Sequence, residues 1–540
     1  MTAPARLPAP VRVAAGVLAA TAALVVLEIG GRLVPGARPA VAAVGDLVID
    51  LTPPWLRDAG IRAFGTADKA VLLAAVALAV AALAAVTGLL AARRPRLGDA
   101  AVAALGALAV AAQLGAAGGG AAGSGAAGPL LTSGLAALVG ALLLRWLLRR
   151  PAHRRRRIVP AATRSPRATA GPAWDRRGFL LRATVVATGV ALGGGVVRVL
   201  DASAAGRRLR ALVRLPEPTV AAPGRAVAAE LGIPGLSPVL TPTGEFYRID
   251  TALRVPQVDV STWALTVGGD VARPLRLTYE DLLAMPQVEA DITLQCVSNE
   301  VGGDLVGTAR WQGVLLADVL RAAGAGDGAD QVVGRSVDGF TAGFPLSVAL
   351  DGRTALIAVG MNGEPLPAAH GYPARLVVPG LYGYVSATKW LASIELTTLT
   401  GFDGYWVPRG WSKLGPIKIA SRIDVPAPEA AVPAGDAVAA GVAWAPTRGI
   451  RSVEVRIDDG AWQPAQLAPA LSQDTWVQWR LSWRAEPGEH VLTVRATDDD
   501  GQVQTDVVAT PRPDGATGLH AVRVLAAART GGTATERRRG

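Results

Sequence analysis

Long uninterrupted apolar stretches fill the first 200 residues of the chain, whereas the remainder mixes apolar and polar positions over short distances. A transmembrane helix needs about 20 apolar residues. Five stretches reach that length, at residues 13–34, 69–92, 98–118, 129–148 and 179–200. The pattern therefore predicts an α-helical membrane anchor, with four spans within residues 1–150 and a fifth at 179–200.

After residue 240 the pattern becomes that of a mixed α and β domain. Residues 263–267 alternate like a half-buried strand, and 376–378 and 394–398 predict further strands. Short helices are predicted at 279–285, before Pro286, and at 315–323, before Gly324. The preceding residues 201–240, with scattered Pro and Gly, are expected to form a linker.

Short alternating segments separated by turns occupy residues 406–512. Strands are predicted at 453–457, 476–483 and 490–496, with Asp- and Gly-containing turns after the first and third of them. Such strands are typical of an immunoglobulin-like β-sandwich, and the tryptophans of 476–483 are interpreted as its core. Residues 513–540 are predicted to be a tail.

The chain has a formal net charge of +11, but its basic residues gather beside the apolar stretches. One cluster comprises Arg93, Arg94 and Arg96, and another comprises Arg145, Arg149, Arg150 and residues 154–157. Cytoplasmic loops of membrane proteins carry such clusters, so nucleic acid is not expected as a partner. The same rule places the amino terminus inside and everything after the fifth span outside.

Few polar residues interrupt the five stretches. Glu28 and Gln113 suit either internal packing or proton handling, and we interpret them as packing residues. The four histidines, at 153, 370, 490 and 520, all lie outside the spans. A haem held by paired imidazoles is therefore not expected in the spans, and the redox partner is expected to be a separate protein.

The only cysteine, Cys296, lies in the run Thr-Leu-Gln-Cys-Val-Ser-Asn-Glu at 293–300. A lone cysteine cannot form an intramolecular disulfide, so it is either a small buried apolar residue or a reactive group. Here it follows a predicted strand and begins a polar turn. A thiolate held there would suit a soft metal centre, and position alone leaves both interpretations open.

The segments TLQCVSNE, GTARWQGVLLADVL, MNGEPLPAAHGYPARLVVPG and ATKWL resemble, in order and spacing, the molybdopterin-binding domain of the sulfite oxidase family. The resemblance extends from about residue 241 to 508, about half of the chain. It implies an α+β molybdopterin-binding catalytic domain at 241–405 and a molybdenum–molybdopterin cofactor. It also implies that Cys296 is the thiolate ligand of the metal.

The resemblance further implies that His370, Arg375 and Lys389 contact the cofactor. A pterin cofactor carries a phosphate, which a planar arginine fork binds well. The alternative is that His370 caps a turn and Arg375 pairs with a carboxylate. Arg310 also matches a cofactor contact, although a structural ion pair explains it nearly as well.

In the family, a domain like that at 406–512 supports dimerisation and contributes an arginine to the active site. The resemblance thus gives Arg480 a catalytic role and allows a homodimer. Two departures concern the substrate, because Glu300 and Phe340 stand where the family has an arginine and a tyrosine. A carboxylate near bound sulfite would oppose it by about 1 kcal/mol or more. These departures argue against sulfite as the substrate.

Residues 151–178 form a basic loop that ends in Asp-Arg-Arg-Gly-Phe-Leu-Leu, at 175–181, which resembles a twin-arginine export signal. Ordinary positive-inside arginines before a span are the alternative. Because the cofactor of this family is inserted in the cytoplasm, the catalytic domain would have to cross the membrane folded. This favours the export signal, although its internal position departs from the usual one.

The sequence as a whole predicts a multi-pass membrane protein whose catalytic half is extracytoplasmic. Its predicted activity is two-electron oxygen-atom transfer on a small molecule, in either the oxidising or the reducing direction. The alternative is a non-catalytic cell-surface binding protein with a degenerate molybdopterin domain. That protein would purify without molybdenum.

Overall fold

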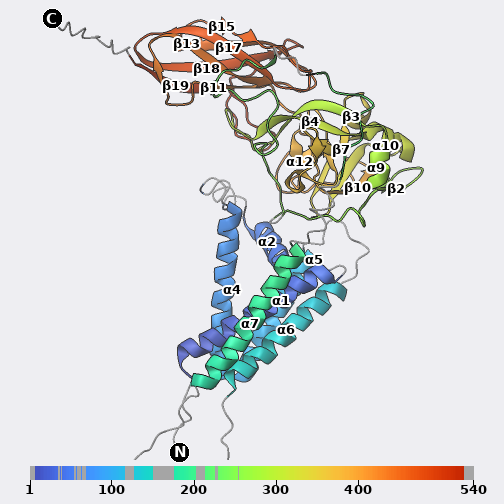
Figure 1. Ribbon diagram of the computed structural model, residues 1–540, viewed down its shortest axis with the longest axis vertical. Coiled ribbons are helices and arrows are strands. Elements are labelled where there is room, and N and C mark those ends of the chain that lie inside the picture. Colours follow the sequence, from blue (N-terminus) through green and yellow to red (C-terminus); the bar gives the residue numbers. More distant parts are fainter. Residues whose placement is uncertain are drawn as a thin grey trace, which may run out of the picture. The chain divides into compact units, whose positions relative to one another are not determined.

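The computed structural model describes residues 7–34, 37, 39–53, 56, 63, 68–115, 127–149, 176–201, 213–224, 229–252 and 255–527. The chain forms two compact units, one comprising Met1–Ala204 with Ala252–Arg254 and the other Ala205–Thr251 with Val255–Gly540. The first is helical and the second is rich in β-strands (Figure 1).

Five helices of the first unit are long and apolar enough to cross a membrane. They are α1 (Ala9–Leu33), α4 (Asp68–Arg93), α5 (Pro95–Gly115), α6 (Ala127–Leu148) and α7 (Arg176–Asp201). They coincide in number and order with the five predicted stretches. A shorter helix, α2 (Ala40–Leu51), was not predicted, because its 12 residues are too few for a span. Arg150 and residues 151–175, including the second part of the predicted basic cluster, lie outside the described residues.

Small residues bring α1 and α4 close together. A side chain on Gly16 would overlap the carbonyl oxygen of Ala84, and one on Gly88 would overlap that of Arg12. Only glycine permits backbones to approach this closely, which is a common way of packing membrane helices.

The two polar side chains noted within the apolar stretches bind neighbouring groups. The carboxylate of Glu28 accepts from Arg32 at 2.6 Å and from the backbone N–H of Val41 in α2 at 2.8 Å. The amide of Gln113 donates to Ser133 of α6 at 3.2 Å. These contacts support their interpretation as packing residues.

The part of the second unit that precedes residue 406 contains two sheets. The first has the order β2-β1-β10-β5-β6, in which β1 and β10 are parallel. Its strands are β1 (Ala264–Gly269), β2 (Leu275–Thr278), β5 (Gln331–Ser336), β6 (Thr341–Pro345) and β10 (Leu391–Thr397). The second has the order β3-β4-β7-β8, with β9 also paired to β7. Its strands are β3 (Val288–Gln295), β4 (Val306–Leu315), β7 (Leu356–Met361), β8 (Glu364–Pro365) and β9 (Arg375–Val377).

Short helices connect these strands: α9 (Tyr279–Ala284), α10 (Leu316–Ala323), α11 (Leu346–Leu350), the 3-10 turn η3 (Ala368–His370) and α12 (Gly383–Ser386). The helices predicted at 279–285 and 315–323 are therefore present. A capping box of Thr278 and Asp281 begins α9, and Gly324 follows the last residue of α10. One large core, centred on fully buried side chains such as Trp311 and Ile292, holds both sheets together.

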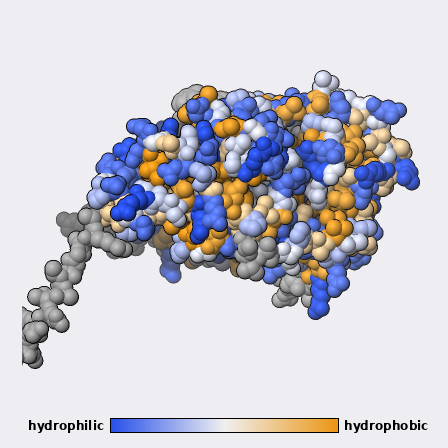
Figure 2. Space-filling model, turned by 90° about the horizontal axis from the view of Figure 1, so that it is seen from above, coloured by the Kyte–Doolittle hydropathy of each residue, from blue (hydrophilic) through white to orange (hydrophobic). Residues whose placement is uncertain are grey.

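The carboxy-terminal part forms two further sheets, of order β11-β13-β17-β16 and β12-β19-β18-β14-β15. The first contains β11 (Ala420–Val425), β13 (Gly435–Trp444), β16 (Gln466–Leu467) and β17 (Val477–Ala485). The second contains β12 (Ala431–Pro433), β14 (Ile450–Ile457), β15 (Gln463–Pro464), β18 (Gly488–Asp498) and β19 (His520–Ala527). Trp479 and Trp483 are buried in the core between them, as predicted. On the face shown in Figure 2, hydrophobic patches lie among hydrophilic residues.

Two parts of the predicted organisation are wrong. Residues 520–527, predicted as tail, form β19, whose Val522, Val524 and Ala526 fill the core. The Pro- and Gly-containing stretch before it looked like the end of the domain. The described parts of the predicted linker 201–240 do not cross open space but pack on the unit. Thr219 donates to Gln287, and Leu231 donates to Gln478. Residues 528–540 lie outside the described part of the chain.

Candidate functional site

Cys296 is the residue that directly follows β3. Its side chain is buried, with 7% exposed, and its backbone N–H donates to Leu305 at 2.9 Å. Burial raises the pKa of the Cys296 thiol, while hydrogen bonds from Ser298 act in the opposite direction. Such a thiol is protonated at neutral pH and is inert as a nucleophile. A coordinated metal would supply the charge that holds it as a thiolate.

Arg375, at the start of β9, is a buried cation. Its guanidinium donates to the carbonyl of His370 at 3.2 Å and lies 4.9 Å from the centroid of the Trp311 ring. Among the described residues no carboxylate forms an ion pair with it, which contradicts the alternative that Arg375 pairs with an acid. Burial lowers its pKa to about 10. Because a buried charge without a counter-charge is costly, this position indicates an anionic ligand.

His370 ends the turn η3 just before Arg375. Its ring Nε2 lies 3.1 Å from the carbonyl oxygen of Thr243, so Nε2 carries the proton and donates it. Burial and the charges of Arg375 and Lys389 lower its pKa to about 4. His370 is therefore neutral at physiological pH, and its Nδ1 is a hydrogen-bond acceptor.

Lys389 is the second cation of the group. Its Nζ lies 2.9 Å from Asp250 Oδ2 and 4.8 Å from the centroid of the Trp390 ring. Arg248 approaches the same carboxylate at 3.5 Å and is half-exposed. Burial lowers the pKa of Lys389 to about 8, although Asp250 favours its charged form. Asp250 thus holds two cations at the edge of the site.

A close approach of the backbone brings these side chains together. Gly371 has φ +112°, and a side chain on it would press on the Cβ atoms of both Arg375 and Lys389. Tyr247 connects this group to the cysteine, because the pKa of its hydroxyl is raised by burial and by Cys296 and is lowered by Arg375. Electrostatic interactions thus link Tyr247 to Cys296 and Arg375, and link Arg375 to His370 and Lys389. The cofactor-binding roles of these residues stay predictions.

The segment at 246–250, Phe-Tyr-Arg-Ile-Asp, is the part of the site that the sequence analysis missed. The Phe246 ring meets the His370 ring edge-on at 5.9 Å and stacks on Tyr247 at 5.2 Å. Asp250 forms ion pairs with Lys389 and with Arg248, as described above. The segment forms no regular strand or helix, so periodicity gave no signal. Its dense mixture of aromatic and charged residues was the only sign.

Arg310 forms a structural ion pair, which was the alternative to a cofactor contact for this residue. Its guanidinium makes two hydrogen bonds of 2.8 Å to Asp291 on the neighbouring strand and a third to the carbonyl of Pro223. The bond to Asp291 raises the pKa of Arg310. A cofactor contact for Arg310 stays a prediction.

Arg480 is not brought to this group. It lies on the outer, exposed face of β17 and donates to Gln466 at 2.9 Å. Successive side chains of a strand point to opposite faces, and Trp479 and Leu481 face the core. No described hydrogen bond or ion pair joins Arg480 to the cysteine, and its catalytic role stays a prediction.

The two residues that argued against sulfite lie in different places. Glu300 is exposed in the loop that follows Cys296. Phe340 is in the turn between β5 and β6, where its ring lies 5.8 Å from that of Tyr405.

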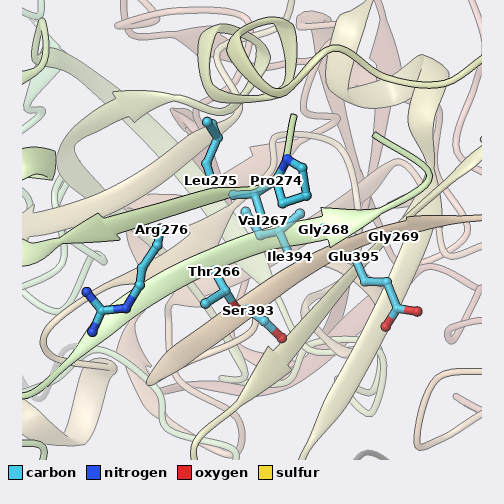
Figure 3. Close-up of a pocket in the computed structure, with 10 residues that line it drawn as sticks. All are labelled: Thr266, Val267, Gly268, Gly269, Pro274, Leu275, Arg276, Ser393, Ile394 and Glu395. Carbon is cyan, nitrogen blue, oxygen red and sulfur yellow. The ribbon is translucent and has the colours of Figure 1, made fainter. Parts of the chain in front are cut away.

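The first sheet carries an open groove over β1, β2 and β10, lined by residues such as Thr266, Arg276 and Glu395 (Figure 3). Cys296 follows a strand of the second sheet, so this groove is not part of the group described above.

Comparison with known proteins decides the family. The model of the oxidoreductase molybdopterin binding domain matches residues 252–406. Sulfite oxidase of Gallus gallus is 30% identical over 320 residues, which are 50% of this chain and 69% of that protein. An uncharacterized oxidoreductase, YuiH of Bacillus subtilis, is 37% identical over 157 residues, which are 29% of this chain and 76% of that protein. The chain belongs to the sulfite oxidase family.

Two further similarities were found. Mitochondrial sulfite oxidase of Mus musculus is 32% identical over 321 residues, which are 50% of this chain. The match spans 58% of that relative's length. The crystal structure of the sulfane dehydrogenase SoxCD from Paracoccus pantotrophus covers 53% of this chain and 81% of its own, with 24% identity and a TM-score of 0.47.

Membership of the sulfite oxidase family makes this chain a molybdenum-cofactor oxidoreductase and implies a molybdenum–molybdopterin cofactor. The described residues fit such a group. Arg375 is a buried cation without a described acidic partner, and Lys389 and Arg248 add positive charge beside it. Cys296 is the one thiol, and it lies near the same tyrosine. The donor set thus combines a soft metal ligand with cations suited to a phosphate.

Proposed function

We propose that the chain is a membrane-anchored molybdopterin-dependent oxidoreductase that transfers an oxygen atom to or from a small molecule outside the cytoplasm. The observation that carries the proposal is Arg375, a buried cation that only an anionic ligand would balance among the described residues. Its nearness to the Cys296 site, through Tyr247, makes a phosphate-bearing metal cofactor the best candidate.

Each residue of the group has a role in this proposal. Cys296 ligates the metal, Arg375 and Lys389 bind the negative charge of the cofactor, and Nδ1 of His370 accepts a hydrogen bond from it. When bound, the cofactor supplies the two-electron redox chemistry and the oxygen-atom exchange. Tyr247 keeps its proton at physiological pH, so its hydroxyl is a hydrogen-bond donor. Half-exposed Arg248, held by Asp250, is available to orient a polar substrate.

The substrate class follows from the same residues. The positively charged side chains named above suit a small oxidised or oxidisable sulfur or nitrogen compound. A reduction of such a compound fits these residues at least as well as an oxidation. Glu300 and Phe340 argue against sulfite itself. A separate redox partner would deliver or remove the electrons.

The carboxy-terminal domain is proposed to be immunoglobulin-like, with a homodimer as its expected assembly. The sheet order supports this. If β11, β13, β14, β16, β17, β18 and β19 are taken as strands A to G, the sheets contain A-B-E-D and G-F-C, as in that fold.

Membrane anchoring and orientation are also part of the proposal. Five apolar helices support the anchor, and the arginine cluster at 93–96 supports a cytoplasmic amino terminus. Arg176 and Arg177 begin helix α7, which agrees with either an export signal or ordinary positive-inside charges.

The test uses the full chain purified in detergent. Molybdenum content is measured, and candidate sulfur and nitrogen compounds are screened with a dye electron donor and a dye acceptor in parallel. We expect about one molybdenum per chain and turnover that Cys296→Ala removes. A folded protein without molybdenum would contradict the proposal and favour the non-catalytic binding protein.

A further inference from the structure

The strand that leads to Cys296 is held at its free edge by the carboxy-terminal domain. Strand β3 pairs with β4 in its sheet, and at the start of its other edge Val220 forms a bridge with Val288. The end of that edge, next to Cys296, is bound by the carboxy-terminal domain. The N–H of Thr293 donates to the carbonyl of Asp474 at 2.9 Å, and the N–H of Trp476 donates to the Thr293 hydroxyl at 2.7 Å. Trp444 donates to Gln295, the residue before the cysteine, at 2.8 Å.

Hydrogen bonds join the two ends of the loop that follows Cys296. The N–H of Cys296 donates to the carbonyl of Leu305, and the N–H of Leu305 donates to the side chain of Asn299 at 2.8 Å. These contacts fix the two ends of the loop. At the tip, formed by Gly302 and Gly303, the N–H of Gly303 donates to the carbonyl of Glu300 at 2.9 Å within the loop itself. Further contacts to the tip come from the carboxy-terminal domain.

The carboxy-terminal domain grips this tip with two side chains. Arg422 of β11 donates to the carbonyl of Gly303 at 2.7 Å. The ring of His520, the first residue of β19, packs against Gly302, where any side chain would overlap it. Gly302 also has φ +79°, which favours glycine.

Both gripping side chains are themselves held in place. Arg422 is buried and donates to Asp424 at 2.6 Å and to Ser237 at 2.8 Å. His520 Nδ1 accepts the backbone N–H of Ile423 at 3.0 Å, which fixes the ring with its proton on Nε2. The tip therefore meets a rigid surface.

We propose that Arg422 and His520 are positioning residues for Cys296: by clamping the tip of its loop, they hold the metal-binding sulfur in place. The inference rests on the proposed function of Cys296 as the metal ligand. A metal ligand must be held within about 0.5 Å of its working position by surrounding contacts. The carboxy-terminal domain then contributes to the site through this clamp.

Because Cys296 is the only thiol of the chain, its rate of alkylation reports directly on the movement of this loop. The full-length chain is made without cofactor, in a host unable to synthesise it. Labelling by iodoacetamide at fixed pH is then followed by mass spectrometry, from zero urea to the unfolding range. The test variants are Gly302→Ala and the double change Arg422→Met with Asp424→Asn, which avoids leaving a buried carboxylate unpaired.

Each variant has a matched control. Gly352 also has positive φ, +95°, but open space around it, so Gly352→Ala repeats the backbone strain without the clash. Arg495 and Glu454 form another ion pair of the carboxy-terminal domain, so Arg495→Met with Glu454→Gln repeats the loss of charge away from the loop. Arg422→Lys keeps a cation that can donate to Gly303 and should restore part of the protection.

We expect iodoacetamide to label Cys296 about 10 to 100 times faster in the clamp variants than in the parent protein without urea. This factor corresponds to the free energy of one charge-assisted hydrogen bond. The controls should stay within about twofold of the parent protein. Parent-like rates in folded clamp variants, or acceleration only where the whole protein unfolds, would overturn the proposal. If Gly302→Ala does not fold, the arginine variants decide the outcome. No step of this test needs molybdenum, so its failure and the failure of the proposed activity are distinguishable.

Discussion

The guanidinium of Arg375 lies over the ring of Trp311, 4.9 Å from its centroid, and no described carboxylate balances its charge. Arg310, on β4, instead forms a close pair with Asp291. Removing the charge of Arg375 and removing that of Arg310 should therefore change the stability of the cofactor-free protein in opposite directions. This difference distinguishes a cation that binds a ligand from one that supports the fold.

Replacing Arg375 by Met should leave the cofactor-free protein as stable as before, or more stable by about 1 kcal/mol, because it removes an unbalanced buried charge. Molybdenum retention should fall severely. Arg310→Met is the control, since it strands Asp291 and should cost about 3 kcal/mol or more. Thermal unfolding and metal analysis of both variants provide the check. Marked destabilisation by Arg375→Met would mean that the arginine supports the fold.

Cys296→Ala should abolish turnover while the fold persists. Loss of one small buried side chain costs about 1 kcal/mol, which a domain of this size tolerates. The measurement is dye-linked activity beside circular dichroism and metal content. Full activity in a folded Cys296→Ala protein would refute its role as metal ligand.

Lys389 predicts a dependence of cofactor retention on pH. Its pKa is lowered to about 8, so the side chain is charged below that pH and loses its charge above it. Retention of the anionic cofactor should therefore weaken as the pH rises through about 8. The stability of the cofactor-free protein should increase from pH 8 to 10.5, because in this range the unfolded chain binds more protons than the folded chain does. Lys389→Arg, charged throughout, should flatten both profiles.

These two profiles are measured by molybdenum content after dialysis and by chemical unfolding at each pH. Retention that is constant from pH 7 to 9.5 in the parent protein would show that Lys389 does not bind the cofactor.

Sulfite oxidation should be weak or absent, because an acid and a phenylalanine replace two residues that the family uses. Steady-state assays of the molybdenum-loaded protein with sulfite and an artificial acceptor measure this. A turnover near 10 per second, about the median for enzymes, would show that Glu300 and Phe340 do not set the substrate.

The double change of Arg176 and Arg177 to lysine keeps both charges and so preserves the positive-inside bias. If the pair is an export signal, residues 201–540 should remain in the cytoplasm while the first four spans insert normally. Protease added to cells without an outer barrier distinguishes the outcomes. Export of a cofactor-loaded double-lysine protein would leave the arginines as topology determinants only.

Local patterns were sufficient to predict the helices and most of the site. A run of 20 apolar residues has no alternative use in a soluble domain, so all five long helices were found. Cys296, His370, Arg375 and Lys389 were predicted because each lies within a contiguous motif, and their roles stay predictions. Arg480 was assigned from its match to the family, although the interpretation of Trp479 and Trp483 as core already placed it on the opposite face of the strand.

Contacts between distant segments were beyond the reach of these patterns. Tyr247 and Asp250 act on residues 50 to 140 positions away, and their segment has no period. Strand β19 was missed for a related reason, because its partner β18 is separated from it by a long irregular stretch. Only the folded chain shows that His520 and Gly302 touch.

Strand β19 has a consequence for biosynthesis. It lies between β12 and β18, so both of these strands have open edges until residues 520–527 have left the ribosome. His520, its first residue, also completes the clamp on the loop of Cys296. This strand, made more than 200 residues after the loop, therefore closes the sheet and steadies that loop. A chain interrupted before residue 520 would expose the unpaired edges of two strands and a cysteine in an unclamped loop. Cellular quality control could recognise the unfinished molecule by either feature.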